Sequence, residues 1–301
     1  MIDRRTFLAA GAGAILAAGC RARAPSKDSS LAQVAADARD RFEAIRGTLG
    51  AGGRLGVAAI DTGSGRELRF DADSRYSMAS TFKLPLAAAV LARVDSGEIS
   101  LDEKLTIPPG RSLDNSPVVD RYRDEGSLSV VRLCSAVVEL SDNSAANMLL
   151  RRLGGPEALT RFIRACSDPV TRVDRYEMEL NSNLPGDPRD TTSPAAMAGL
   201  VRTLVLGDKL SQQSRRHLST WLTKSVPGAD RLKAGLPAPP WLVGHKTGTG
   251  ANGAVNDVAI AWRSGRPPVV IACYQSGGTA DRPARFAAHA AVGRLVAETF
   301  G

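Results

Sequence analysis

The 301-residue sequence is poor in aromatic side chains, with 3 tryptophans, 4 tyrosines and 7 phenylalanines. RNA-binding sheets interleave aromatic and basic side chains, and no such pattern occurs here although the formal net charge is +8. Lysine and arginine alternate with aspartate and glutamate along the whole chain. We therefore interpret the positive balance as a solvated basic surface and expect no nucleic-acid partner.

Histidine and cysteine are scarce as well. His217 and His245 are far apart in the sequence, as are His245 and His289, so no pair has zinc spacing, and no C-x-x-C pair occurs. Three of the 4 cysteines lie in apolar stretches, and this odd set is typical of buried free thiols rather than of a disulfide framework. They are Cys134, Cys166 and Cys273. We expect no metal site.

The sequence also lacks the signatures of several large protein classes. No apolar run reaches the roughly 18 residues of a membrane span. No G-x-S-x-G elbow or Walker loop is present, which argues against an α/β-hydrolase triad and a nucleotide site. One G-x-G-x-x-G match, residues 248–253, leads into a strand-like segment, whereas a dinucleotide site needs a helix there.

The first residues resemble an export signal. A twin arginine at residues 4–5 precedes a short apolar stretch, residues 8–18, and a lipobox-like A-A-G-C that ends at Cys20. Two alternatives are open: lipidation of Cys20, which would anchor the mature chain to a membrane, or plain cleavage near Ala24. Either one predicts residues 1–24 to be a signal segment for twin-arginine export.

Hydrophobic periodicity predicts strands toward both ends of the chain and helices between them. Residues 55–61 and 67–70 flank a T-G-S-G turn, which predicts a hairpin. Further strands are predicted at 241–249, 254–262 and 268–275, and helices at 31–49, 81–94, 128–140, 145–153, from Ser193-Pro194 onward and at 280–300.

This order of elements predicts one α/β domain, residues 25–301, made of two lobes. The two chain ends, about 31–75 and 225–301, form the α/β lobe, and about 76–224 form an inserted helical lobe. A groove between such lobes is a natural ligand site. The long aperiodic stretch between residues 168 and 192 is of the kind that is usually functional.

Residues 80–83 read S-T-F-K and lie where a predicted helix begins. A spacing of three residues places the Ser80 hydroxyl and the Lys83 amine on one helix face. Free backbone N–H groups and the positive end of the helix dipole there favour a nucleophile and an oxyanion. Taken alone, the motif fits a capping serine with an exposed lysine equally well.

Two further motifs occupy the joins of predicted elements. S-D-N at 141–143 lies between two helices, where serine and aspartate are also good caps, and K-T-G-T-G at 246–250 ends a strand, where a turn is the plainer interpretation. In this order and on these elements, the three motifs together leave little room for chance.

The set S-x-x-K, S-D-N and K-T-G resembles that of class A serine β-lactamases and penicillin-binding proteins. From about residue 31 to 300 the chain resembles a class A enzyme, and R-Y-E-M-E-L-N at 175–181, closed by 186–191, resembles its omega loop. Transpeptidases lack the glutamate of this loop. The resemblance implies a two-lobe fold whose antiparallel sheet is flanked by terminal helices, a β-lactam substrate, no cofactor and a monomer.

The resemblance also implies roles for individual residues. Ser80 would attack the lactam carbonyl, and the backbone N–H groups of Ser80 and Thr249 would form the oxyanion hole. Lys83 would act as a neutral base or as a positive stabiliser, an alternative that stays open. Glu177, steadied by Asn181, would hold the water that hydrolyses the ester.

Other positions are implied to grip the substrate. Ser141 would pass a proton to the lactam nitrogen, and Asn143 would bond the side-chain amide of the substrate. Arg231 is expected to reach under the K-T-G strand, the alternative being an exposed arginine. The substrate carboxylate would face Lys246, Thr247, Gly248 and Thr249.

Arg175 and Asp190, at the two ends of the omega loop, resemble an ion pair that clamps it; the alternative is two solvated surface charges. The chain departs from the family pattern at Asn115, where many relatives carry an aromatic residue, and at His245, where an acidic residue usually stands. Two other functions remain open: a cell-wall peptidase or transpeptidase, and a sensor that is acylated and stops. Glu177 argues against both.

Overall fold

The computed structural model describes residues 27–301, so the predicted signal segment lies outside the described residues. The two chain ends build a five-stranded sheet in the order β2-β1-β9-β8-β7, antiparallel throughout. The strands are β1 (Arg54–Asp61), β2 (Glu67–Phe70), β7 (Trp241–Thr249), β8 (Val255–Arg263) and β9 (Arg266–Ser276). The predicted hairpin is thus the pair β1–β2.

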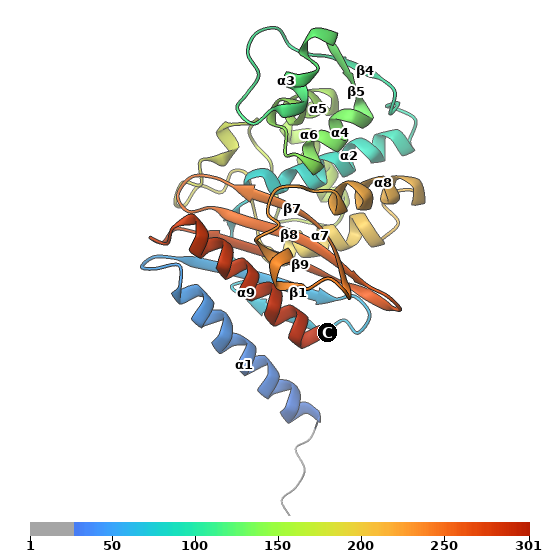
Figure 1. Ribbon diagram of the computed structural model, residues 1–301. Coiled ribbons are helices and arrows are strands. Elements are labelled where there is room, and N and C mark those ends of the chain that lie inside the picture. The colour runs from blue at the N-terminus through green and yellow to red at the C-terminus, as the bar shows by residue number, and fades with distance from the viewer. Residues whose placement is uncertain (1–26) are drawn as a thin grey trace, which may run out of the picture.

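Helices cover both faces of this sheet. The terminal helices α1 (Lys27–Gly47) and α9 (Arg282–Phe300) lie together on one face, and the inserted helices lie on the other (Figure 1). Alternate residues of β1 accordingly pack into two different cores, Ala58 and Ile60 on the helical side and Val57 and Ala59 under the terminal helices. Burial on both faces explains why the central strands read as continuous apolar runs.

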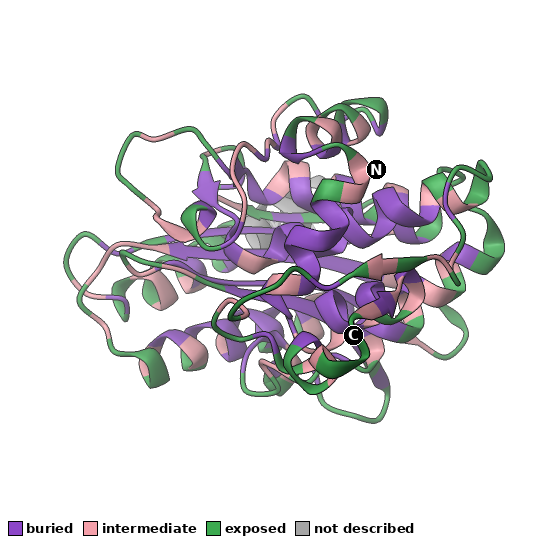
Figure 2. Cartoon of the chain, turned by 90° about the horizontal axis from the view of Figure 1, so that it is seen from above, coloured by how far each residue is buried: buried purple, intermediate pink, exposed green. Residues whose placement is uncertain are grey.

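The inserted part is helical and surrounds one buried helix. All nine residues from Lys83 to Leu91 of α2 are buried, and buried positions concentrate in the sheet and the helix faces toward it, while the peripheral loops are exposed (Figure 2). The helices are η1 (Ala79–Phe82), α2 (Lys83–Asp95), α3 (Pro117–Arg121), η2 (Arg123–Glu125), α4 (Val130–Glu139), α5 (Asn143–Leu153), α6 (Pro156–Ala165), η3 (Glu179–Asn181), α7 (Pro194–Leu206) and α8 (Gln212–Thr223).

Short elements join distant parts of the chain. β3 (Tyr76–Ser77) pairs with β6 (Thr191–Thr192), and β4 (Lys104–Thr106) pairs with β5 (Ser127–Ser129). A further 3-10 turn, η4 (Leu232–Gly235), precedes β7 and packs on α9. Among residues 27–301, no helix combines the length and the apolar character that a membrane span requires.

Candidate active site

Ser80 is half-buried in the η1 turn that leads into α2. Lys83 is the first residue of α2, and its fully buried Nζ lies 3.1 Å from Ser80 Oγ. Ala79, the residue before Ser80, has a φ of +43°, which is uncommon for a residue with a side chain. The turn therefore presents Ser80 from a strained backbone, as is frequent at functional sites.

The S-D-N turn lies directly against Lys83. Lys83 Nζ donates to the Ser141 carbonyl at 2.9 Å and also to Asn143 Oδ1. Ser141 has a φ of +60°, and its Oγ lies 3.4 Å from Lys83 Nζ and 3.0 Å from Lys246 Nζ. Asp142 caps α5 by accepting the Ala145 N–H at 2.8 Å. The S-D-N motif therefore both caps the helix and places Ser141 and Asn143 against Lys83.

Glu177 brings the omega loop into the same cluster. Its Oε1 lies 2.8 Å from Lys83 Nζ, and both side chains are fully buried. Asn181 Nδ2 donates to Glu177 Oε2 at 2.6 Å. The side-chain amide of Asn147, on α5, binds the Glu177 backbone. It donates to the Glu177 carbonyl and accepts the Glu177 N–H, each at 2.9 Å.

Asn147 was missed in the sequence reasoning, although a signal was present. It follows Asn143 by four residues on a predicted helix, and that spacing places both amides on one face. Nothing in the sequence alone, however, indicates that the omega loop crosses this face.

The ends of the omega loop are joined by a largely buried ion pair. Arg175 Nε lies 2.6 Å from Asp190 Oδ2, and Asp190 Oδ1 accepts the N–H groups of Asp174 and Arg175 at 2.7 and 3.0 Å. Asp190 is only 1% exposed, so these residues are not two solvated surface charges. The Asp190 carbonyl also accepts the Met78 N–H at 3.0 Å, which ties the loop to the segment before Ser80.

The K-T-G strand passes close to the η1 turn that carries Ser80. A Cβ added at Gly248 would lie 2.7 Å from the Met78 carbonyl oxygen and 3.2 Å from Ser80 N, so only glycine permits this approach. Lys246 is fully buried and donates to the Thr247 carbonyl at 2.9 Å as well as to Ser141. Thr249, at the end of β7, is exposed.

Arg231 lies under this strand. It is 5% exposed, which excludes the alternative of a surface arginine. Its guanidinium donates to the Gly248 and Asn256 carbonyls at 2.9 and 2.7 Å and to Thr249 Oγ1 at 2.8 Å. The arginine therefore fixes the hydroxyl that ends the K-T-G segment.

Burial and charge shift the pKa values of both lysines. Burial lowers the pKa of Lys83, and the nearby Glu177 carboxylate opposes this shift. Burial holds the pKa of Lys246 well below its usual value, and repulsion from Lys83 and Arg231 adds to the effect. Lys83 is thus suited to proton transfer, and the Lys246–Arg231 side is suited to binding an anion.

Asn115, one of the two departures from the family pattern, contacts the S-D-N turn. Its Nδ2 donates to the Ser141 carbonyl at 2.9 Å, and its own carbonyl accepts the Asn143 N–H at 3.0 Å. Its φ of +57° lies in the left-handed region that asparagine tolerates. In place of an apolar wall, this position supplies two hydrogen bonds to the S-D-N turn.

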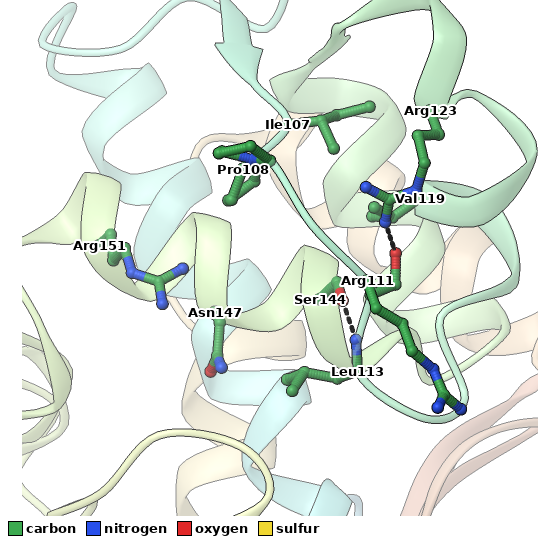
Figure 3. A pocket seen from close by; sticks show the side chains of 11 residues that line it. Ile107, Pro108, Arg111, Leu113, Val119, Arg123, Ser144, Asn147 and Arg151 are labelled. Atoms are coloured by element: carbon green, nitrogen blue, oxygen red, sulfur yellow. Dashed lines mark hydrogen bonds between the residues drawn. The ribbon is translucent and has the colours of Figure 1, made fainter.

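A separate pocket of about 150 Å³ lies beside α5 (Figure 3). Ser144 and Asn147 line it together with Arg123 and Arg151, and the Ser144 hydroxyl accepts the Leu113 N–H at 2.9 Å. Ser80, Lys83 and Glu177 do not line this pocket, whereas Asn147, which holds the Glu177 backbone, does. The pocket therefore adjoins the cluster around Ser80 through Asn147.

Comparisons with known proteins agree with this geometry. Residues 38–300 match the profile of the β-lactamase enzyme family. β-Lactamase AST-1 of Nocardia asteroides is 42% identical over 305 residues, which cover 99% of this chain and 96% of the relative. The carbapenem-hydrolysing β-lactamase KPC of Klebsiella oxytoca is 42% identical over 251 residues, covering 83% and 85% respectively.

A solved structure gives the same result. The class A β-lactamase of the last common ancestor of Gram-negative bacteria is 48% identical and superimposes with a TM-score of 0.83, covering 89% of this chain and 99% of that one. The fold is therefore the two-lobe fold of class A enzymes, as expected from the motifs. Since the family profile and these relatives span most of the chain, the protein belongs to the β-lactamase enzyme family and, within it, to class A.

Proposed function

We propose that the chain opens the β-lactam ring of penicillin- and cephalosporin-type antibiotics through an acyl-enzyme on Ser80 and releases the product with water held by Glu177. Membership of the family makes it a hydrolase of β-lactams and a determinant of antibiotic resistance. The observation that carries the residue assignment is the continuous contact from Ser80 Oγ to Lys83 Nζ, at 3.1 Å, and on to Glu177 Oε1, at 2.8 Å.

Acylation uses the groups around Ser80. As Ser80 Oγ attacks the lactam carbonyl, its proton passes either to Lys83, whose pKa burial lowers, or through a water to Glu177. The backbone N–H groups of Ser80 and Thr249 would stabilise the oxyanion. Ser141, 3.0 Å from Lys246 Nζ, would protonate the departing lactam nitrogen.

Deacylation uses the omega loop. The Glu177 carboxylate accepts a hydrogen bond from Asn181 and can take a proton from a water placed between these two side chains and the ester. The Arg175–Asp190 pair supports the loop, and Asn147 supports the Glu177 backbone. A general base in a fixed position is what a hydrolase needs and what a long-lived acyl-protein lacks.

Substrate binding falls to the other side of the cluster. The lactam carboxylate would lie against Lys246, Thr247, Gly248 and Thr249, with Arg231 holding the Thr249 hydroxyl. Asn143 would accept and donate hydrogen bonds at the side-chain amide of the substrate. No cofactor takes part in this scheme.

Stopped-flow turnover of the chromogenic cephalosporin nitrocefin separates this function from the two alternatives. A β-lactamase gives many turnovers per enzyme without a lasting adduct. A sensor gives one equivalent of product and stops, and a transpeptidase gives slow turnover with a persistent acyl-enzyme. Absence of sustained turnover by the wild-type protein would contradict the proposal.

We also propose twin-arginine export, with residues 1–24 as the signal segment, and an exported domain of residues 25–301 whose lobes divide near residues 75 and 225. The support is the twin arginine at 4–5 and the lipobox-like sequence that ends at Cys20. Replacing both arginines by lysine should block export and retain the enzyme in the cytoplasm. Labelling with a lipid precursor, compared with Cys20→Ala, decides between a lipid anchor and plain cleavage, and gel filtration tests the proposed monomer.

A further inference from the structure

A buried histidine–aspartate pair connects the substrate-binding strand β7 to its neighbour β8, and the mechanism proposed above does not use it. His245 on β7 is 1% exposed, and Asp257 on β8 is completely buried. His245 Nδ1 lies 3.1 Å from Asp257 Oδ1 and 3.3 Å from Oδ2. An ionised carboxylate can only accept, so His245 Nδ1 carries the hydrogen of this contact.

The carboxylate makes a second contact, with the segment that carries Arg231. Asp257 Oδ2 accepts the N–H of Leu232 at 3.2 Å, and Leu232 directly follows Arg231 in the chain. Arg231 in turn donates to Thr249 Oγ1 at 2.8 Å and to the Gly248 carbonyl at 2.9 Å. A connected path thus leads from His245 through Asp257 and Arg231 to the end of the K-T-G strand.

The surroundings leave this path little freedom. A Cβ added at Gly228 would lie 2.3 Å from Thr247 Cγ2 and 3.4 Å from His245 Cε1, so the loop before Arg231 packs tightly over the pair. Thr247 and Asp257 are register partners on β7 and β8. A shift of Asp257 would therefore move two groups that face the substrate in the proposed function: Thr247 directly, and Thr249 through Arg231.

Asp257 carries its charge in this setting. Burial acts to raise its pKa, but His245, His289 of α9 and Arg231 together hold the pKa below its usual value. Cys273, the register partner of Asp257 on β9, is also buried, and burial keeps its thiol protonated by raising its pKa. An unpaired buried carboxylate is costly, so loss of the His245 donor should displace Asp257 toward its remaining partners.

We propose that His245 and Asp257 are positioning residues, which hold Arg231 and Thr249 at the place where the lactam carboxylate binds. This inference rests on the proposed function of the K-T-G strand. The hydrogen bonds of the pair lead to the segment that carries Arg231 and not to Glu177, so the pair should affect substrate capture and acylation and leave deacylation unchanged. His245, at a position where relatives usually carry an acidic residue, then contributes to the site that binds the substrate carboxylate.

The test compares two substitutions at one position. His245→Phe keeps an aromatic ring, although a larger one, and removes the donor, whereas His245→Asn places an amide N–H near the position of Nδ1. With benzylpenicillin, His245→Phe should lower the acylation efficiency, kcat/KM, about tenfold, because a buried carboxylate loses its partner. The deacylation rate from single-turnover kinetics should stay at the wild-type value, and His245→Asn should recover most of the loss.

A second substrate and a second variant complete the design. A methyl ester of the penicillin carboxylate should show little difference between wild type and His245→Phe, since it offers Arg231 and Thr249 no charge. Asp257→Asn, which removes the negative charge that His245 and the Leu232 N–H bind, should reproduce the effect if His245→Phe does not fold. Thermal melting by circular dichroism checks that each variant is folded.

The outcomes separate the two levels of the proposal. Unchanged kcat/KM in folded His245→Phe and Asp257→Asn, an equal fall in acylation and deacylation, or an equal loss for acid and ester would each overturn the positioning role. If the wild-type protein itself shows no turnover of benzylpenicillin, the proposed function fails instead.

Discussion

The two sides of the cluster around Ser80 handle charge in opposite ways. On the helical side, Lys83 is paired with Glu177 at 2.8 Å, so the two buried charges compensate each other. On the sheet side, Lys246 and Arg231 are both buried cations that repel each other, and the buried Asp257 carboxylate is paired with His245. The helical side can move a proton without a change in net charge, whereas on the sheet side neither Lys246 nor Arg231 forms a salt bridge within residues 27–301.

This difference indicates a division of labour. Proton transfer among Ser80, Lys83 and Glu177 requires short contacts between groups of matched charge. The sheet side requires only a fixed positive field that the substrate carboxylate would complete, and burial together with repulsion from Lys83 and Arg231 lowers the pKa of Lys246 there. Substitutions on the helical side should therefore change the chemical steps, and those on the sheet side should change binding and acylation.

Ser80→Ala should have the largest effect and sharpen this division most. Without the nucleophile of the proposed mechanism, kcat should fall by a factor on the order of 10⁶, as for the removal of catalytic serines elsewhere. The sheet side is intact in this variant. Its Kd for benzylpenicillin, measured by calorimetry, should therefore stay within a few-fold of the Kd of the wild-type complex that precedes acylation. Turnover near the wild-type rate would remove Ser80 from the mechanism.

Arg231→Ala should act on the sheet side alone. Loss of its hydrogen bonds to Thr249 and Gly248 should lower kcat/KM for penicillins and cephalosporins by about 1–3 kcal/mol in transition-state stabilisation. The deacylation rate should not change, because Glu177 lies on the other side. Equal kcat/KM in variant and wild type would show that Arg231 only supports the strand.

The pH dependence of binding should differ between charged and neutral substrates. Burial and neighbouring cations hold the pKa of Lys246 well below its usual value, so its charge is present below that lowered pKa and is lost as the pH rises through it. In the Ser80→Ala protein, the Kd for benzylpenicillin should therefore increase with rising pH well before pH 10. The matching methyl ester serves as control, and an identical pH profile for acid and ester would contradict this assignment.

Asn115→Ala should have the smallest effect of the four. The side chain is exposed, and its loss removes one hydrogen bond, at 2.9 Å, to the Ser141 carbonyl. We expect a decrease of about 0.5–1.5 kcal/mol in transition-state stabilisation, seen in kcat because the proposed mechanism has Ser141 protonate the lactam nitrogen. A change confined to KM would instead place Asn115 in substrate contact.

Local sequence patterns predict most of the helices and strands. β2 and β7 have the predicted bounds, because apolar runs, Ser and Asp caps and Pro194 act locally. The elements that lie within a few residues of their predicted positions are β1, β8, β9, α2, α4, α5, α7 and α9. The helices α6 and α8 were missed. α8 shows only Leu218, Trp221 and Leu222 as a short apolar stripe in a polar sequence, so its helix depends on packing rather than on a strong pattern.

The motifs predicted the site better than they predicted its support. Ser80, Lys83, Ser141, Glu177 and Lys246 meet as their motifs suggest. The supporting residues are found only through tertiary contacts, and their signals in the sequence are weak: a polar residue within the apolar strand β8, or a four-residue spacing from Asn143 on a helix. Asn147 and Asp257 are examples, as is Asn256, whose amide donates to the Ser77 and Met78 carbonyls at 2.8 and 3.0 Å.

The most direct test of hydrolysis through Glu177 is a mass spectrum of the Glu177→Ala protein after mixing with benzylpenicillin. Ser80 and the sheet side are intact in this variant, so acylation should proceed while deacylation slows by about 10²-fold or more. We predict a mass increase equal to one penicillin, stable for many wild-type turnover times, with a single burst of product and no adduct in the Ser80→Ala control. An unmodified Glu177→Ala protein that turns over benzylpenicillin as fast as wild type would contradict the proposed role of the omega loop.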